Sequence, residues 1–174
     1  MQTKNTIYVG ELRNTSLGDF RLAASTLGLV AVEWAFASTE FDSCLARLRQ
    51  PLEDNQKQIA IYANQIKEYL NRKRKTFSIS IDWTHFTDFQ RSTLKEVLRI
   101  PYGETRTYAA IAKAIKHPNA YRAVGAANAM NPMPIVIPCH RVLGSDGKLH
   151  GYGGGDGLPT KQWLLDFEHR NSIS

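Results

Sequence analysis

The stretch TYAAIAKAIKHPNAYRAVGAAN, residues 107–128, determines the expected fold of the second half of the chain. Thr107 is a favourable N-cap, and the residues after it predict a short helix over 108–115. The break at 117–119, His-Pro-Asn, ends that helix, because proline disfavours helical geometry at the residue before it. A second helix is predicted over 120–128. Two short helices joined by a tight turn are typical of a helix-turn-helix, although an ordinary helical hairpin packed on its own core has the same pattern.

The second of these helices carries mostly small side chains. Ala123, Gly125 and Ala127 lie on it, and small residues let a helix approach another surface closely. Arg122 is the only long cation on this helix, so it could reach a phosphate group or insert into a base stack. An ordinary surface arginine would give the same sequence.

Residues 131–142 read NPMPIVIPCHRV, with three prolines in seven residues. The prolines exclude a helix and stiffen the backbone, and the apolar run 135–137 is expected to be buried. Cys139 and His140 follow directly. A thiol at the end of a rigid buried segment, beside an imidazole, is placed as an activated nucleophile would be. The alternative is an inert buried cysteine that packs as a small apolar side chain.

A carboxylate that could orient the imidazole lies near the C-terminus. Glu168 follows Leu164 and Leu165 by four and three positions, so it lies on or beside the apolar face of a helix. A carboxylate facing a core needs a partner, and an imidazole is a suitable one. An exposed glutamate at a fraying helix end would have the same spacing. The glycine-rich loop 151–155 lacks the lysine and the spacing of a phosphate-binding loop.

The first half of the chain has the pattern of a small sheet with a helix. Strands are expected over 6–9, 20–24 and 29–34, the last two as a hairpin. Apolar residues at spacings of three and four predict a helix over 59–70, and alternation over 77–83 predicts a half-buried strand.

These patterns predict an α+β protein of two domains. Residues 1–86 are expected to form an N-terminal α/β domain, a small antiparallel sheet with a helix, in a supporting role. Residues 87–174 are expected to form a mostly helical C-terminal domain with the helix-turn-helix. Its first helix has an apolar face at Phe89, Thr93, Leu94, Val97 and Leu98.

Composition limits the protein classes that remain. With 174 residues, 43% hydrophobic and 22% charged, the chain has the composition of a packed soluble protein. It has no apolar run near the roughly 20 residues of a membrane helix and no secretory signal, so a cytoplasmic protein is expected. Its two cysteines, Cys44 and Cys139, cannot form a disulfide scaffold, and Cys44 is expected to be structural. The net charge of +6 weakly favours polyanions, and the run RKRK at 72–75 suits a solvated helix end.

The segment IPCHRV, residues 137–142, resembles the active-site motif of the O6-alkylguanine-DNA alkyltransferases. Other motifs fall in the order of that family, and the resemblance is strong over 87–170 and loose over 1–86. These motifs are IPYGET at 100–105, TY at 107–108, RAVG at 122–125, NP at 131–132, YGG at 152–154 and WLL at 163–165.

The resemblance implies a role for each matching residue. Cys139 would be the alkyl acceptor, His140 its base acting through water, and Glu168 the residue that orients His140. Asn131 would brace the turn and the thiol by hydrogen bonds. Tyr108 would rotate a phosphate and donate toward guanine N3 as the base leaves.

The same resemblance implies a DNA interface and a substrate pocket. Arg122 would fill the stack that the flipped nucleotide leaves. The remaining DNA-binding candidates are Thr107, Ala123, Gly125 and Ala127, and the pocket candidates are Met133, Pro134, Tyr152 and Gly153.

The partner implied is double-stranded DNA containing O6-alkylguanine, with O4-alkylthymine as a further substrate. The extruded base would pass its alkyl group irreversibly to Cys139, once per molecule, in a monomer without cofactor; cooperative binding to DNA stays open. No metal is expected, because residues 1–86 offer only Cys44 and His85 of the ligand types that bind zinc in some relatives. A Cys–His hydrolase and a DNA-binding regulator without alkyl transfer are the competing hypotheses.

Overall fold

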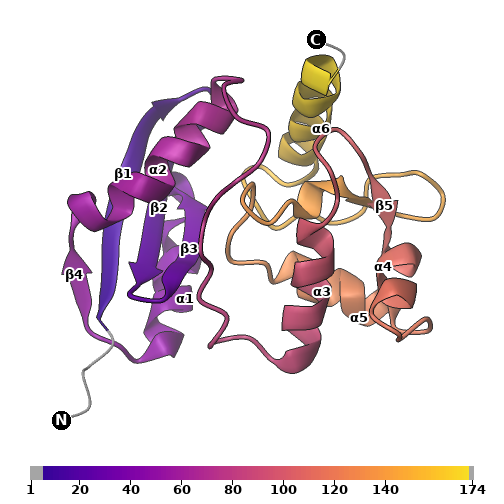
Figure 1. Ribbon diagram of the computed structural model, residues 1–174, viewed down its shortest axis with the longest axis horizontal. Coiled ribbons are helices and arrows are strands. Elements are labelled where there is room, and N and C mark those ends of the chain that lie inside the picture. Colours follow the sequence, from indigo (N-terminus) through magenta and orange to yellow (C-terminus); the bar gives the residue numbers. More distant parts are fainter. Residues whose placement is uncertain (1–5, 173–174) are drawn as a thin grey trace. The chain divides into compact units, whose positions relative to one another are not determined.

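The computed structural model describes residues 6–172, and the chain forms two compact units (Figure 1). The first unit ends at His85 and the second begins at Phe86. Within residues 6–172, none of the helices has the length and apolar character of a membrane span.

The first unit is built on a four-stranded sheet with the strand order β3-β2-β1-β4. Strands β1 (Ile7–Thr15), β2 (Gly18–Ser25) and β3 (Gly28–Trp34) pair antiparallel. The predicted hairpin is confirmed as β2 and β3, which turn where Ser25 pairs with Gly28. The short strand β4 (Leu52–Asp54), which the sequence did not indicate, pairs parallel with β1 at the edge.

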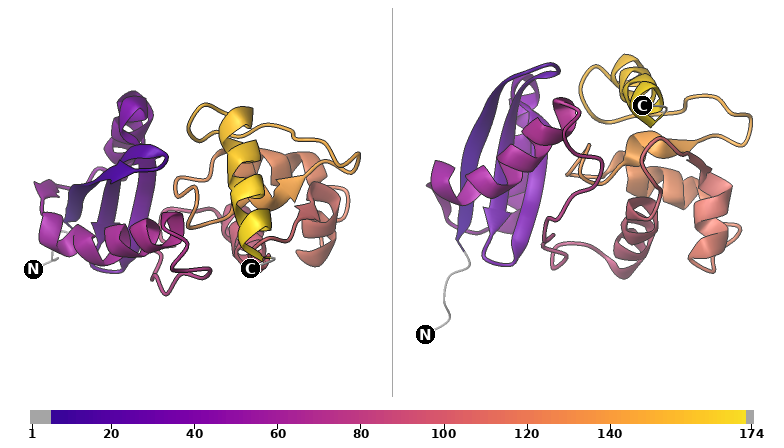
Figure 2. Two further views of the ribbon diagram at one scale, coloured as in Figure 1. Left: turned by 90° about the horizontal axis from the view of Figure 1, so that it is seen from above. Right: turned by 45° about the horizontal axis from the view of Figure 1, so that its top comes forward.

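Two helices cover opposite faces of this sheet (Figure 2). Helix α1 (Ser38–Leu48) follows a 3-10 turn, η1 (Ala35–Ala37), and packs Phe41 and Leu45 into a core cluster with strand residues. Helix α2 (Gln56–Leu70) confirms the helix predicted over 59–70 and begins earlier, because the Asn55 side chain caps it.

The strand predicted over 77–83 is wrong. The segment is extended but forms only an isolated parallel bridge, between Ile81 and Leu29. The reason lies at Ser78, whose backbone N–H donates to the Gln65 side chain at 2.8 Å and whose carbonyl accepts from it at 3.2 Å. Backbone groups that are bonded to a side chain cannot join a ladder. Alternation alone does not reveal this competition.

The second unit is mostly helical, as predicted. Helix α3 (Asp88–Leu98) begins with a capping box formed by Thr87 and Gln90. Helix α4 (Tyr108–Ala114) begins after Thr107, whose side chain accepts from the N–H of Ala110, so the predicted N-cap is confirmed.

The rest of this unit completes the frame of the candidate site. Helix α5 (Tyr121–Ala129) packs against α3 and α4, and helix α6 (Leu158–Ser172) ends the described chain. A 3-10 turn, η2 (Cys139–Arg141), leads into β6 (Val142–Leu143), which pairs parallel with β5 (Arg106–Thr107).

Candidate active site

The segment between α5 and η2 is held by one asparagine. The Asn131 Oδ1 atom accepts from the backbone N–H of Met133 at 3.0 Å, which closes a local turn. Its Nδ2 atom donates to the carbonyl of Ile137 at 2.9 Å and to the Cys139 Sγ atom at 3.1 Å. The predicted burial of residues 135–137 is confirmed, since their exposed fractions are 0%, 2% and 0%. The rigid segment therefore delivers the thiol to a fixed position.

Cys139 is the first residue of η2, and 4% of its surface is exposed. An amide N–H that donates to sulfur stabilises the thiolate more than the thiol. Asn131 therefore favours the reactive form of this side chain.

The buried imidazole of His140, the residue after the cysteine, contacts the buried carboxylate of Glu168. The His140 Nε2 atom lies 2.8 Å from Glu168 Oε1, and their exposed fractions are 0% and 1%. An ionised carboxylate only accepts hydrogen bonds, so Nε2 carries the proton and Nδ1 has the free lone pair. Within the described residues, His140 Nδ1 is buried without a hydrogen-bond partner. The imidazole can therefore accept a proton at that atom.

The Glu168 carboxylate also binds the guanidinium of Arg141. Arg141, 6% exposed, donates to both carboxylate oxygens at distances from 2.8 to 3.2 Å, and the backbone N–H of Gly103 donates to Oε2 at 3.0 Å. Burial raises the pKa of Glu168, but the bonds from His140 and Arg141 outweigh it and hold the pKa well below its usual range. Burial lowers the pKa of His140, although Glu168 opposes this. The resting site therefore contains a neutral imidazole against an ionised carboxylate.

Tyr108 and Lys161 form a second group of polar side chains in the same unit. The Tyr108 hydroxyl donates to the carbonyl of His150 at 3.3 Å, and the Lys161 Nζ atom donates to that carbonyl at 2.9 Å and to the carbonyl of Val142 at 2.7 Å. Lys161 is fully buried, with Nζ 5.8 Å from the centre of the Tyr108 ring. Burial lowers the pKa of Lys161 to about 8, and the charge of Cys139 acts in the opposite direction.

Three further side chains belong to the candidate site beyond those expected from the sequence, namely Asn128, which donates to the Cys139 carbonyl, Arg141 and Lys161. For Lys161 a signal existed, since it precedes Leu164 by three and Glu168 by seven positions and so lies on the buried face of α6. Arg141 lies within the IPCHRV motif, but nothing in the sequence marks it as a partner of Glu168. Nothing in the local pattern marked Asn128.

The candidates for DNA binding divide between the surface and the interior. Arg122 and Ala123 are exposed near the start of α5, and the Arg122 guanidinium lies 5.8 Å from the centre of the Tyr121 ring. Gly125 and Thr107 are half-buried, and Thr107 caps α4. Ala127 is only 4% exposed, so its small side chain allows close packing inside the unit rather than facing outward. Because it is buried, Ala127 offers almost no surface for the DNA contact that was expected there.

The pocket candidates also differ in exposure. Met133 and Pro134 are buried, whereas Tyr152 is half-buried and Gly153 is exposed. A Cβ atom on Gly153 would lie 2.9 Å from the carbonyl oxygen of Ala129. The glycine-rich loop therefore runs directly beside the end of α5, where a larger residue would push it away.

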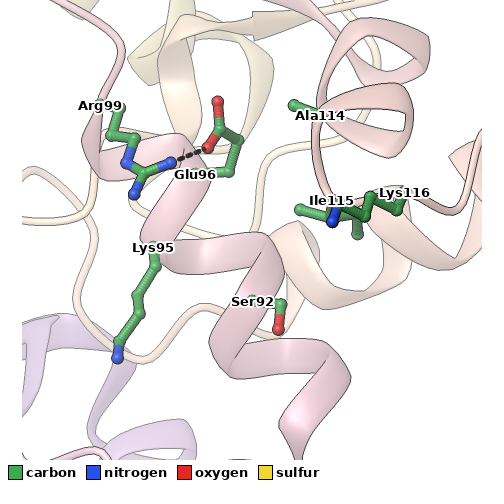
Figure 3. Close-up of a pocket in the computed structure, with 7 residues that line it drawn as sticks. All are labelled: Ser92, Lys95, Glu96, Arg99, Ala114, Ile115 and Lys116. Atoms are coloured by element: carbon green, nitrogen blue, oxygen red, sulfur yellow. Dashed lines mark hydrogen bonds and ion pairs between the residues drawn. The ribbon is translucent and has the colours of Figure 1, made fainter.

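A hollow of about 290 Å³ lies between α3 and the end of α4 (Figure 3). Glu96 forms an ion pair with Arg99 there, and the other lining residues are Ser92, Lys95, Ala114, Ile115 and Lys116. None of the predicted site residues lines it. Among residues 6–172, no three His, Cys, Asp or Glu side chains are arranged to hold a metal ion.

Both units match known families. Residues 88–170 match the 6-O-methylguanine DNA methyltransferase, DNA binding domain, and residues 7–83 match the 6-O-methylguanine DNA methyltransferase, ribonuclease-like domain. A methylated-DNA–protein-cysteine methyltransferase of Methanosarcina barkeri is 49% identical over 118 residues, which are 68% of this chain and 73% of that relative. The inducible enzyme of that name from Bacillus subtilis is 41% identical over 158 residues, 88% of this chain and 86% of the relative.

Solved structures agree with these matches. The O6-methylguanine methyltransferase of Mycobacterium tuberculosis superposes with a TM-score of 0.76 at 33% identity, over 95% of this chain and 94% of that chain. The crystal structure of the OGT protein of that organism in complex with DNA superposes over the same shares, with a TM-score of 0.77 and 33% identity.

Proposed function

The chain belongs to the methylated-DNA–protein-cysteine methyltransferase family of DNA repair proteins, and from this premise we propose that it transfers alkyl groups from O6-alkylguanine in duplex DNA to Cys139. The observation that carries the proposal is the chain of buried contacts at the thiol. An amide donates to the Cys139 sulfur, and the neighbouring His140 is bonded to Glu168. This arrangement supplies a thiolate, a base and a counter-charge for that base.

The transfer requires a sulfur nucleophile. His140 is neutral and has its free lone pair at Nδ1, so it takes the thiol proton through a bridging water. The imidazolium that results is stabilised by the Glu168 carboxylate. Because Arg141 also binds that carboxylate, Glu168 stays ionised throughout.

In the transfer step an S–C bond forms as the bond between the alkyl carbon and guanine O6 breaks. The electron pair of the broken bond stays on the guanine, which takes a proton at N3 from the Tyr108 hydroxyl. Tyr108 then regains a proton through solvent, and the proton supplied is the one that His140 removed from the thiol. A thioether has no hydrolysable bond, so each molecule reacts once. O4-alkylthymine presents a comparable alkyl–oxygen bond and is a second substrate.

The DNA must bring the damaged base to a largely buried sulfur, so the base has to leave the duplex. Helices α4 and α5 act as a helix-turn-helix that holds the DNA, and the exposed Arg122 enters the stack in place of the flipped nucleotide. The first unit supports this domain. One chain carries every group that these steps need, so a monomer is sufficient.

The proposal is tested with a duplex oligonucleotide containing one O6-methylguanine. After incubation, intact-mass and peptide analysis are expected to show a gain of one methyl group at Cys139, and a titration is expected to stop at one lesion per molecule. The same duplex with unmodified guanine is the control. An unmodified protein that turns over an ester or amide repeatedly would instead identify a Cys–His hydrolase.

A further inference from the structure

Asn128 lies in the last turn of α5, on the same helix as Arg122, and only 5% of its surface is exposed. Burying an amide costs free energy unless its polar atoms form hydrogen bonds, so the partners of Asn128 indicate what the residue does.

The first contact of Asn128 is with the backbone of the nucleophile. Its Nδ2 atom donates to the carbonyl of Cys139 at 3.2 Å, and that carbonyl also accepts from the N–H of Val142. Asn131, three residues further on, donates to the sulfur of the same cysteine. Asn128 therefore binds the carbonyl of Cys139 and Asn131 binds its sulfur, and of the two amides only Asn128 belongs to α5.

The side of α5 that carries Asn128 also faces Tyr108. Asn128 and Gly125 are three positions apart, on one side of α5. A Cβ atom on Gly125 would lie 3.9 Å from the Tyr108 ring, so this side of the helix faces the ring. Burial raises the pKa of Tyr108, and the Asn128 amide opposes that rise. An N–H group that stabilises the phenolate makes Tyr108 a better proton donor.

The geometry points to Asn128 as a positioning residue that joins Tyr108 to Cys139, so that the proton donor and the sulfur meet the extruded base at a fixed separation. This inference rests on the proposed function. When Tyr108 gives its proton to guanine, charge develops on the phenol oxygen, and a donor already in place stabilises that charge without reorganisation. The Asn128 Oδ1 atom is buried and makes no hydrogen bond within the described residues, so the donor side of the amide carries this role.

The test is the single-turnover rate constant of alkyl transfer from a methylated duplex and from free O6-benzylguanine. Asn128→Leu keeps the bulk of the side chain but removes the amide, and with it the hydrogen bond to the Cys139 carbonyl and the N–H group that faces Tyr108; Asn128→Ala is the second variant. Each is expected to react about tenfold to a hundredfold more slowly on both substrates, with wild-type affinity for DNA. Asn64→Leu, at an exposed position of α2, is the matched control and is expected to react at the wild-type rate.

The amplitude of this reaction separates folding from positioning. Because each molecule reacts once, the amplitude measures the folded fraction, whereas the rate constant measures the chemistry of folded molecules. A residue that only stabilises the fold would lower the amplitude and leave the rate constant unchanged.

A double-mutant cycle with Tyr108→Phe sharpens the result. If Asn128 acts through the Tyr108 hydroxyl, Asn128→Leu adds less to the loss in the Tyr108→Phe background than in the wild type. Additive losses, or wild-type rate constants in both Asn128 variants, would overturn the inference. A wild-type protein that acquires no alkyl group would instead overturn the proposed function.

Discussion

Within residues 6–172, each unit contains one carboxylate that is 1% exposed, Asp82 in the first and Glu168 in the second. Asp82 accepts from the Ser25 hydroxyl at 2.6 Å and from the backbone N–H of Thr84 at 3.0 Å. Burial raises the pKa of both carboxyls, and their hydrogen bonds outweigh burial and lower it. In both places burial disfavours the ionised carboxylate and hydrogen bonds stabilise it, but the groups that form those bonds differ.

The partners decide what each carboxylate can do. The hydrogen-bond donors to Asp82 are the neutral groups of Ser25 and Thr84, the His85 imidazole lies farther away, at 3.7 Å from Oδ2, and together these contacts fix the segment 82–85. Glu168 binds a guanidinium and an imidazole, and the imidazole adjoins a cysteine. A buried carboxylate is therefore informative about chemistry only through the groups that it ionises or orients.

The largest expected effect separates the two cysteines. Cys139→Ala is expected to abolish alkyl transfer while DNA affinity is retained, because the acceptor sulfur is lost and the exposed face of α5 is not altered. Cys44→Ala, in the first unit, is expected to leave transfer intact, since Cys44 packs beside the core cluster and burial raises its pKa. Mass analysis and fluorescence anisotropy measure the two properties. Full function of Cys139→Ala would support a DNA-binding regulator.

The next largest effects are expected when each buried carboxylate is replaced by its amide. Glu168→Gln leaves Arg141 buried without its counter-charge, so the free energy of unfolding is expected to fall by about 3–5 kcal/mol. Transfer is expected to slow by about a hundredfold, because the His140 base loses its stabilising charge. Asp82→Asn is expected to cost about 1–3 kcal/mol through a poorly matched buried amide and to leave the rate constant unchanged. Denaturant unfolding and single-turnover kinetics measure both; equal kinetic losses would contradict the distinction.

A smaller effect tests base extrusion in the second unit. Arg122→Ala is expected to slow repair of a methylated duplex by about tenfold or more, since the vacated stack is no longer filled. Reaction with free O6-benzylguanine needs no extrusion and is expected to stay at the wild-type rate. Arg13→Ala, an exposed arginine of β1, is the control. Equal losses on both substrates would exclude this role for Arg122.

The smallest effect is a pH dependence of opposite sign in the two units. Burial, the largest influence, raises the pKa of Glu33 to about 7 from 4.5, so its contribution to stability is lost as the pH rises through 7. The pKa of His140 is lowered from 6.5, so its contribution is present above 6.5 and is lost as the pH falls. Acidification from pH 7.5 to about 5 is therefore expected to stabilise the first unit and destabilise the second.

Hydrogen exchange, corrected for intrinsic rates, measures this dependence separately in peptides of each unit. Glu33→Gln is expected to remove the response of the first unit and to leave that of the second. Responses of the same sign in both units would contradict the assignment.

The local sequence pattern was sufficient to predict an element wherever residue spacing, turn residues or a capping side chain define it. The helix of α2, the N-cap at Thr107, the hairpin of β2 and β3 and the buried run 135–137 follow from spacing and capping. Helix α1 and strand β4 were not found, because α1 has few buried positions and β4 is short and exposed.

The sequence by itself indicated Cys139 and His140 as the candidate nucleophile and base and predicted the α+β fold class, because these inferences depend on residue type, motif order and short-range spacing. Only the tertiary structure decided which polar groups are partners. The Gln65 side chain forms hydrogen bonds with the backbone of Ser78. Arg141 and His140 both bind Glu168. Asn128 donates to the carbonyl of Cys139, eleven positions away. Such bonds join residues far apart in the chain, and no periodicity records them, since a side chain's partner depends on how the elements pack.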